Sequence, residues 1–313
     1  IFKLTPTIRY SVCIVSHNRR DQLDRTVFEL SKRIHSDTEV LVWLDGCTDG
    51  SELLKSKYAN VNWFGSSQRM GGSRSRRKLY DLASGDILIG FDDDSHPLTD
   101  QFIEITQNVF DQNPDTGILA YRIWWSTTDA NQHLTMADGG DAYVAGDFAG
   151  CGFAIRKKCY RDTGGFPDWM NIYGEELYLS IKAHLKGYSI RYSPEVLVQH
   201  RVDVQSRSEG PRVAFWFYHQ LRNNALLVLL LYPGQRAFLS FLKMWWHNLI
   251  KYVLSGQQSI WIFLKAFFSV MLHFPALLFR EERMTMVQYK TFRKLPLPVY
   301  SWKPAVEINS THG

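Results

Sequence analysis

Apolar and polar residues alternate in blocks along the first two hundred residues. Short apolar runs at residues 10–16, 39–44 and 61–64 have the length and composition of strands, and the stretches between them, at 20–34 and 48–58, have the spacing of helices. Strands that alternate with helices in this way are typical of a parallel sheet. The pattern therefore predicts an α/β fold.

The same pattern continues to about residue 200. A helix is predicted over residues 73–83, a strand over 87–91, and further strands over 118–125, 153–156 and 188–198. A helix over 175–186 ends at Gly187, a residue type common at helix ends. Ligands bind at the carboxyl ends of strands in open α/β sheets, so residues that follow these strands are the first candidates for a site.

The composition changes near residues 206–211, a polar stretch with Gly and Pro. Residues 213–279 are then strongly apolar, with scattered Arg, Lys and His. The length of 313 residues also exceeds that of a usual single domain. We expect two parts, an α/β domain over residues 1–208 and an amphipathic helical region over residues 209–313.

Charge and cysteine content narrow the class of protein. The formal net charge of +5 is mild for this length and does not suggest a nucleic-acid-binding protein, whereas it suits a phosphate-bearing ligand or an anionic lipid. The four cysteines have no C-x-x-C spacing, and the given sequence does not open with a signal peptide. We expect a protein of a reducing compartment.

Three consecutive carboxylates, Asp92-Asp93-Asp94, follow the strand predicted at residues 87–91. Carboxylates this close repel one another unless a cation relieves the charge, and oxygen ligands suit Mg²⁺ or Mn²⁺. Alternate residues of an extended segment point the same way, so Asp92 and Asp94 are expected to act together while Asp93 faces elsewhere. A solvated acidic turn is the alternative.

Several segments resemble, in their order, the family 2 glycosyltransferases of the GT-A fold. They include Ser-Val-Cys-Ile-Val-Ser-His-Asn-Arg at 11–19, Leu-Asp-Gly-Cys-Thr-Asp-Gly-Ser at 44–51, and Ala-Ser-Gly-Asp-Ile-Leu-Ile-Gly-Phe-Asp-Asp-Asp at 83–94. Residues 150–200 extend the resemblance, which covers about the first two hundred residues. It implies a Rossmann-like mixed, mainly parallel sheet and an inverting, metal-dependent transfer of a sugar from a nucleotide diphosphate.

The resemblance assigns residues to the donor. Asp45 would accept from the N3–H of uracil or thymine, and it is the sole candidate because Leu44 precedes it; an Asx-turn or a helix cap is the alternative. Arg76 matches the arginine of the family's helix, within a basic cluster that suits a diphosphate. Asp92 would reach the ribose or a metal-bound water, and Asp93 is assigned to the donor with it.

The metal ligands and the catalytic base are also implied by the resemblance. Asp94 is the expected carboxylate ligand of Mn²⁺ or Mg²⁺, and His200 is the second ligand. Glu176, in Gly174-Glu175-Glu176, aligns with the catalytic acid of the family, which would act as the general base. A structural histidine and simple compensation of the helix dipole are the respective alternatives.

The segment Gly165-Phe166-Pro167-Asp168-Trp169 resembles the family's acceptor-side loop. Phe166 and Trp169 are expected to stack on a sugar, and Asp168 to accept from its hydroxyl groups. Trp169 could equally belong to the core.

The apolar region after residue 209 suits helices that lie in a bilayer interface. Residues 260–279 are nearly long enough to span a membrane, but they contain Lys265, His273 and Pro275, which favours attachment over crossing. A core or oligomerisation role is the alternative. Arg222-Asn223 also resembles a segment that follows the catalytic domain in rhamnosyltransferase-like members.

The sequence therefore predicts a glycosyltransferase that uses a UDP- or dTDP-sugar and a saccharide or lipid-linked acceptor. We expect it in the cytoplasm, peripherally attached to the inner face of the cell membrane, with a role in cell-surface polysaccharide or glycolipid synthesis. Two alternatives are a non-catalytic relative that binds sugar or membrane and a nucleotidyltransferase. The second expects a Gly-rich loop after the first strand, where this chain has Ser16-His17-Asn18-Arg19.

Overall fold

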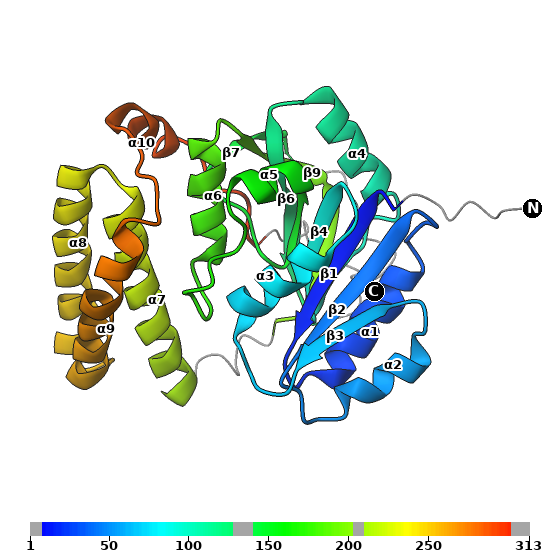
Figure 1. Cartoon of the computed structure of the whole chain (residues 1–313), viewed down its shortest axis with the longest axis horizontal. Helices are drawn as coiled ribbons and strands as arrows, with labels where there is room; N and C mark the ends of the chain where they lie inside the picture. Colours follow the sequence, from blue (N-terminus) through cyan, green and yellow to red (C-terminus); the bar gives the residue numbers. More distant parts are fainter. Residues whose placement is uncertain (1–7, 128–139, 203–209, 302–313) are drawn as a thin grey trace, which may run out of the picture.

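A mixed sheet with helices on both faces forms the first part of the chain, and a group of helices packs beside it (Figure 1). The structure, a computed structural model, describes residues 8–127, 140–202 and 210–301. The predicted domain boundary at residues 208/209 lies outside the described residues.

The sheet has the strand order β3-β2-β1-β4-β8-β6-β9-β5, and β7 pairs with β9. Strands β1 to β4 run parallel, β8 is antiparallel to β4 and β6, and β9 is parallel to β6. The strands are β1 Tyr10–Ser16, β2 Thr38–Asp45, β3 Asn62–Ser66, β4 Ile87–Asp92, β5 Ser95–Pro97, β6 Thr116–Trp125, β7 Tyr143–Ala145, β8 Gly152–Arg156 and β9 Ser189–His200.

Alternation along the strands builds a core on each face of the sheet. In β1, Val12 and Ile14 pack toward the side covered by α1, α2 and α4, whereas Cys13 packs toward α3, α5 and α6. These helices are α1 Arg20–Ser31, α2 Leu54–Lys57, α3 Gly72–Leu82, α4 Phe102–Gln112, α5 Lys157–Asp162 and α6 Glu175–Leu185. The two-sided burial confirms the α/β fold.

Several elements differ from the prediction. The helix expected over 48–58 is a 3₁₀ turn, Ser51–Leu53, followed by the single turn α2. Helix α4 was not predicted, although Phe102, Ile103, Thr106 and Phe110 give it one buried face. Strands β5 and β7 and helix α5 are also additional. These elements are short or lie within stretches whose pattern is weak.

Within the described residues, four helices and a π-helical segment follow the sheet. They are α7 Gly210–Leu231, α8 Gly234–Asn248, η4 Leu249–Leu254, α9 Ile260–Leu278 and α10 Met286–Phe292. Residues of α7, such as Leu226 and Leu230, belong to the same buried cluster as Leu179 and Ile181 of α6. The helical part therefore completes the core on that side of the sheet, and the chain before residue 208 does not close this core alone.

Polar contacts fix the helical part to the sheet domain as well. Glu281 accepts from Tyr178 at 2.9 Å and from Lys182 at 3.0 Å, both on α6. The segment after α10 returns to the sheet domain, where Gly146 N–H donates to the carbonyl of Pro296 at 2.8 Å.

One helix of the described residues, α9, is long and apolar enough to cross a membrane by length and composition. Only 22% of its apolar window is buried in the molecule. Pro275 lies inside this helix.

Candidate functional site

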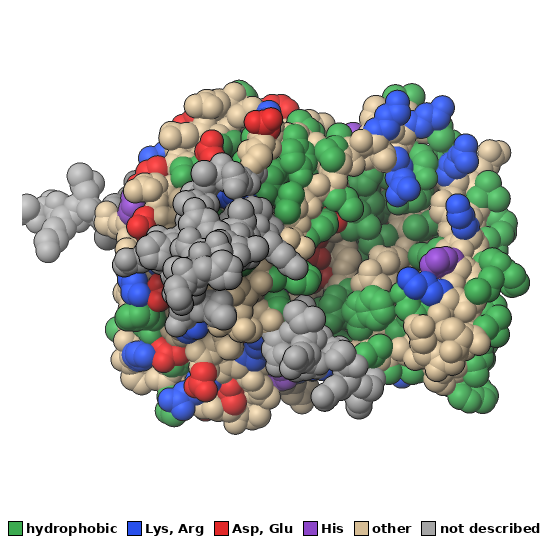
Figure 2. Space-filling model, turned by 180° about the vertical axis from the view of Figure 1, so that it is seen from behind, with side chains coloured by type: hydrophobic (Ala, Val, Ile, Leu, Met, Phe, Trp, Pro, Cys, Tyr) green, Lys and Arg blue, Asp and Glu red, His purple; other side chains and the backbone are tan. Residues whose placement is uncertain are grey.

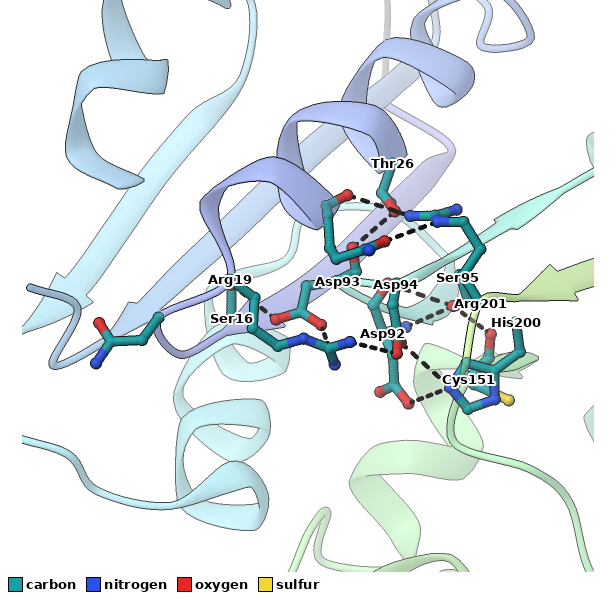
Figure 3. Close-up of polar contacts among 12 residues, drawn as sticks. Ser16, Arg19, Thr26, Asp92, Asp93, Asp94, Ser95, Cys151, His200 and Arg201 are labelled. Carbon is teal, nitrogen blue, oxygen red and sulfur yellow. Dashed lines mark hydrogen bonds and ion pairs between the residues drawn. The ribbon is translucent and has the colours of Figure 1, made fainter. Parts of the chain in front are cut away.

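The three aspartates lie where β4 ends and the chain turns into β5. Ser16 Oγ donates to Asp93 at 2.8 Å, and the guanidinium of Arg19 contacts Asp93 at 3.0 Å and Asp94 at 2.7 Å (Figure 3). These partners come from β1 and the residues just after it, because β1 and β4 are parallel neighbours whose carboxyl ends meet. The acidic cluster is therefore built into the sheet edge and is not a solvated turn.

Asp93 and Asp94 differ in surroundings. Asp93 faces Ser16 and Arg19, and burial raises its pKa to about 7. Burial would also raise the pKa of Asp94, but His200 and Arg19 lower it well below its usual range. Asp94 is thus held as a carboxylate on the side of His200, where the prediction placed it together with Asp92.

A group of metal-binding side chains meets at this edge. Ligand atoms of Asp92, Cys151 and His200 lie within 4.8 Å of one another. His200 Nε2 is 3.2 Å from Asp94 Oδ1 and 3.9 Å from Asp92 Oδ2. Among the described residues, Asp94 Oδ1 and both ring nitrogens of His200 are buried without a hydrogen bond of normal geometry. A buried carboxylate oxygen and an imidazole without hydrogen-bond partners are the ligands that a divalent cation would use.

Sequence reasoning missed Cys151 and Arg19 at this site. The antiparallel register of β4 and β8 pairs Phe91 with Gly152, which brings Cys151 beside Asp92. The signals available were Gly150-Cys151-Gly152 and the arginine that ends the first motif. Neither motif indicates which strand will lie beside it in the folded protein.

Arg76 of α3 joins the aspartates to the acid pair of α6. Its guanidinium is 2.6 Å from Asp92, 2.8 Å from Glu175 and 3.6 Å from Glu176. Burial opposes the charge, but these carboxylates raise the pKa of Arg76 above its usual value. Arg76 thus lies at the predicted site, with three carboxylates as its partners.

The two glutamates at the start of α6 have different roles in the structure. The side chain of Glu175 is 2% exposed and is bound to Arg76, whereas that of Glu176 is 24% exposed. Burial raises the pKa of both carboxyl groups. Gly150 faces Glu176 Oε1 so closely that a Cβ at position 150 would collide with it. Glu176 is therefore the more accessible acid.

The loop before α6 is held by α7. Tyr173 and Gly174 have φ angles of 69° and 97°, in the left-handed region that costs a residue with a side chain energy. Asn223, which is fully buried on α7, donates through Nδ2 to the carbonyls of Ile172 and Tyr173, both at 2.8 Å. Helix α7 thus positions the start of α6 and its two glutamates.

A second carboxyl group lies near Glu176. Asp147 accepts from Ser180 of α6 at 2.9 Å and from the hydroxyl of Tyr300 at 3.0 Å. Burial raises the pKa of Asp147 to about 6, and the charge of Glu176 adds to this effect. The segment that follows α10 therefore reaches the neighbourhood of the acid pair.

Asp45 ends β2 and is 2% exposed. Its carboxylate accepts from the backbone N–H of Met70 at 2.6 Å and of Gly71 at 2.9 Å. Asp45 thus anchors the loop that leads into α3, and it is not the cap of the segment 48–58. The role of Asp45 in binding the base stays a prediction.

The residues of the predicted acceptor loop differ in exposure, with one buried in the core and two at the surface. Phe166 is 1% exposed, packs edge-on against Tyr80, and lies 5.9 Å from the Arg76 guanidinium. Its assignment to sugar stacking is therefore corrected, because the ring is part of the core beneath Arg76. Asp168 is exposed and Trp169 is partly exposed, so both can meet a ligand.

Comparison with known proteins bears on this geometry. The family described as "Glycosyl transferase family 2" matches residues 11–169, which is about half of the chain. No curated protein sequence matches the chain.

Solved structures with similar folds include three glycosyltransferases. GalNAc-T7 with UDP, GalNAc and Mn²⁺ has a TM-score of 0.56 at 18% identity, over 72% of this chain and 48% of that one. S. aureus TarS 1–349 with UDP-GlcNAc has a TM-score of 0.55 at 16% identity, over 78% and 73%. The mannosyltransferase PcManGT from Pyrobaculum calidifontis with GDP-Man and Mn²⁺ has a TM-score of 0.55 at 14% identity, over 92% of this chain and 79% of that one. These similarities confirm the expected GT-A fold, and this chain spans about half the length of GalNAc-T7.

Proposed function

Because the chain belongs to glycosyl transferase family 2, we propose that it transfers a sugar from a nucleotide diphosphate donor to an acceptor hydroxyl, with inversion. The observation that carries this proposal is the meeting of three groups at one sheet edge. They are the cation site at Asp92, the cationic link Arg76 and the accessible acid Glu176.

The carboxylates at the end of β4 support the proposed binding of the nucleotide diphosphate donor. Asp92, Asp94, Cys151 and His200 would hold Mn²⁺ or Mg²⁺, the first of which is present in the GalNAc-T7 and PcManGT structures. A bound cation would neutralise the negative charge that develops on the leaving diphosphate. Arg19 keeps Asp94 in place, since it donates to that carboxylate at 2.7 Å. UDP or dTDP is the proposed nucleotide.

Glu176 is the proposed general base. Inversion by direct displacement needs a group that takes the proton of the attacking hydroxyl, and its pKa works best when raised toward neutrality. Burial raises the pKa of Glu176, and its side chain keeps an exposed fraction of 24%. Glu175 is bound to Arg76 instead and would position that arginine. The pair thus divides into a base and a support.

We propose that the helical part attaches to a membrane and that the acceptor is bound there. Hydrophobic side chains cover much of the helical part, with lysines and arginines among them (Figure 2). The exposed apolar residues of α8 and α9 include Phe238, Leu239, Leu242, Trp246, Trp261, Phe268 and Leu272. Apolar area mixed with basic residues suits peripheral attachment to an anionic leaflet. A lipid-linked saccharide at the inner face of the cell membrane is therefore the proposed acceptor, and the rhamnosyltransferase-like subtype stays a prediction.

A non-catalytic relative would not need this arrangement. Arg76 is buried with three carboxylates and the cation site has unpartnered atoms, which is costly for stability unless ligands use them. We therefore favour the enzyme over a module that only binds sugar or membrane.

Thermal unfolding with and without Mn²⁺ tests the proposal. At a hundredfold excess over the dissociation constant, UDP or dTDP with Mn²⁺ should raise the midpoint by about 5 °C, and neither alone should do so. Asp92→Asn and Asp94→Asn should lose the shift, while Asp115→Asn at an exposed site should keep it. A shift of the same size without a divalent cation, or in Asp92→Asn, would refute the metal-dependent donor site.

A further inference from the structure

A cleft of about 370 Å³ lies between the sheet domain and the helical part. One wall is formed by the loop that enters α3 and by the loop around Trp169, and the other by α7 and α9. The arginines that line it are Arg69, Arg74 and Arg222, and the histidines are His219 and His273; they come from three separate parts of the chain.

This cleft carries positive charge that its own walls do not balance. The described residues that line it include no aspartate or glutamate. Burial and the neighbouring Arg222 and Arg69 lower the pKa of His219 to about 4, so this ring is neutral. His219 Nδ1 is buried without a hydrogen-bond partner among the described residues. The unpaired nitrogen can bond to a ligand, and the three arginines in the same lining favour a ligand that is anionic.

The side chain of Arg222 is built into the cleft wall. It is 6% exposed, and it donates to Ser269 Oγ at 3.0 Å and to the carbonyl of Trp169 at 3.3 Å. These contacts fix the guanidinium with neutral partners, which leaves its charge uncompensated. Arginine held in this way is suited to phosphate oxygens, because its planar fork can donate two parallel hydrogen bonds.

The basic cluster at residues 69–78 is divided in space. Arg76 turns to the acid pair, and Arg77 donates to the carbonyls of Gly164 and Phe166. Only Arg69 and Arg74 of this cluster line the cleft. The cleft is therefore separate from the carboxylate-rich end of β4, although the loop anchored by Asp45 borders it through Met70.

We infer that this cleft binds a phosphate or diphosphate group of the acceptor, an inference that rests on the proposed function. Trp169, which belongs to the predicted acceptor loop, lines the cleft, and the loop from Asn171 leads directly to the acid pair at the start of α6. A sugar attached to this phosphate would have to extend along this loop to reach Glu176. On the other side, α9 contributes Ser269 and His273 to the cleft and exposes Phe268 and Leu272. A lipid chain attached to the same phosphate would lie along these apolar residues.

The test uses inorganic pyrophosphate as the probe, with full-length protein in a buffer that contains EDTA. The chelator keeps the cation site empty, so binding there is not measured. Calorimetry should report binding by the wild type. Arg74→Gln, at an exposed position, should weaken it about tenfold, the usual effect of losing one charge-assisted hydrogen bond. Lys78→Gln, one turn further along α3 and outside the cleft, is the matched control.

Arg222→Gln gives a second variant in the buried wall, and thermal unfolding checks that it is folded. The inference is overturned if pyrophosphate does not bind without a divalent cation, or if Arg74→Gln and folded Arg222→Gln bind it as the wild type does. Metal-dependent UDP binding is measured on the same protein preparations after the EDTA buffer is exchanged for one that contains Mn²⁺. Its loss in every sample would refute the proposed function, whereas its retention without a pyrophosphate effect would refute only the anion cleft.

Farnesyl diphosphate distinguishes the source of the phosphate. Tighter binding of farnesyl diphosphate than of pyrophosphate, reduced by Phe268→Ser and Leu272→Ser, supports a lipid headgroup. Equal affinity for the two probes, still weakened by Arg74→Gln, supports the same anion site with a soluble phosphorylated ligand.

Discussion

Arg76 Nη2 lies 2.6 Å from Asp92 Oδ1, so that one guanidinium connects the end of β4 to the start of α6 through its second contact with Glu175. The contact ties a carboxylate of the proposed cation site to the element that carries the proposed base. We therefore expect a change at either end to alter the other.

Replacement of Arg76 by lysine tests this link. Lysine keeps the charge but cannot bridge Asp92 and Glu175 with a fork, so we expect a loss of about 2–4 kcal/mol in unfolding free energy and a large loss of transfer. Chemical denaturation measures the first and product formation the second. Arg77→Lys, at a partly exposed side chain of the same helix, should lose much less. Equal effects of the two substitutions would show that the bridge is unimportant.

Cys151 would distinguish the proposed cation site from one made only of oxygen and nitrogen ligands. A thiolate favours soft cations, so the wild type should bind Cd²⁺ at least tenfold more tightly than Cys151→Ser, while Mg²⁺ affinity should change little. Competition against a fluorescent metal indicator measures both affinities. Cys47→Ser, at a partly exposed cysteine outside the metal group, is the control. If Cys151→Ser keeps the Cd²⁺ affinity, the sulfur is not a ligand.

Much of the first half of the fold follows from local pattern. The apolar run at 10–16 is β1 itself, and Val12 and Ile14 on one face with Cys13 on the other show why the alternation specified a two-sided sheet. The acidic end of β4 was also predictable, whereas the sequence did not indicate that Arg19 would contact both Asp93 and Asp94. Helix α4 was not, because its buried residues lie between polar ones in a short segment.

The rest of the site depends on contacts between distant residues. Cys151 meets Asp92 through an antiparallel register, and Asn223 holds a loop fifty residues earlier in the chain. In the sequence, Asn223 is a polar residue in an apolar helix, without a sign of its partner. Phe166 was misassigned because an aromatic in a loop that contains glycines gives no local indication that its ring points inward.

Glu176→Gln should keep donor binding and lose most transfer. The amide is nearly isosteric but cannot accept a proton, and loss of a general base costs about 10²–10⁴-fold in rate. Glu175→Gln should instead weaken the contact with Arg76 and lower stability as well as rate. Turnover assays and UDP calorimetry on both variants separate the two roles. Turnover of Glu176→Gln within a few-fold of the wild type would place the base elsewhere.

Asp147 makes the stability of the protein depend on pH. Its pKa is raised from 3.8 to about 6, so the folded state binds the proton more tightly than the unfolded state does. The resulting stabilisation is complete below about pH 4 and is lost as the pH rises through 6. Since Asp147 is only partly buried, Asp147→Asn should remove a difference of about 1–2 kcal/mol between pH 4 and pH 8.

The measurement is the unfolding free energy of wild type and Asp147→Asn at several pH values, taken as their difference, so that other titrating groups cancel. The neighbours whose charges or hydrogen bonds act on Asp147 are the backbone N–H of Phe148, Ser180, Glu176 and Tyr300. Tyr300→Phe should shift the same curve, because it removes a donor to the carboxylate. A difference between wild type and Asp147→Asn that does not vary with pH would contradict the raised pKa.

Membrane attachment is best tested on the exposed face of α8 and α9. Truncation near residue 208 would also remove α7, which shares the core with α6 and holds the loop before the acid pair. Replacing Trp246, Trp261 and Leu272 by serine removes exposed apolar area and leaves the buried residues in place. We expect the wild type to float with anionic liposomes and to be released by high salt, since each basic residue near the surface contributes about 1 kcal/mol. The triple variant should remain in solution even at low salt.

Phe28→Ser, which replaces an exposed aromatic of α1, is the control and should float as the wild type does. Wild type that stays in solution with every lipid would mean that this face packs against another protein surface, and the proposed membrane acceptor would then be wrong.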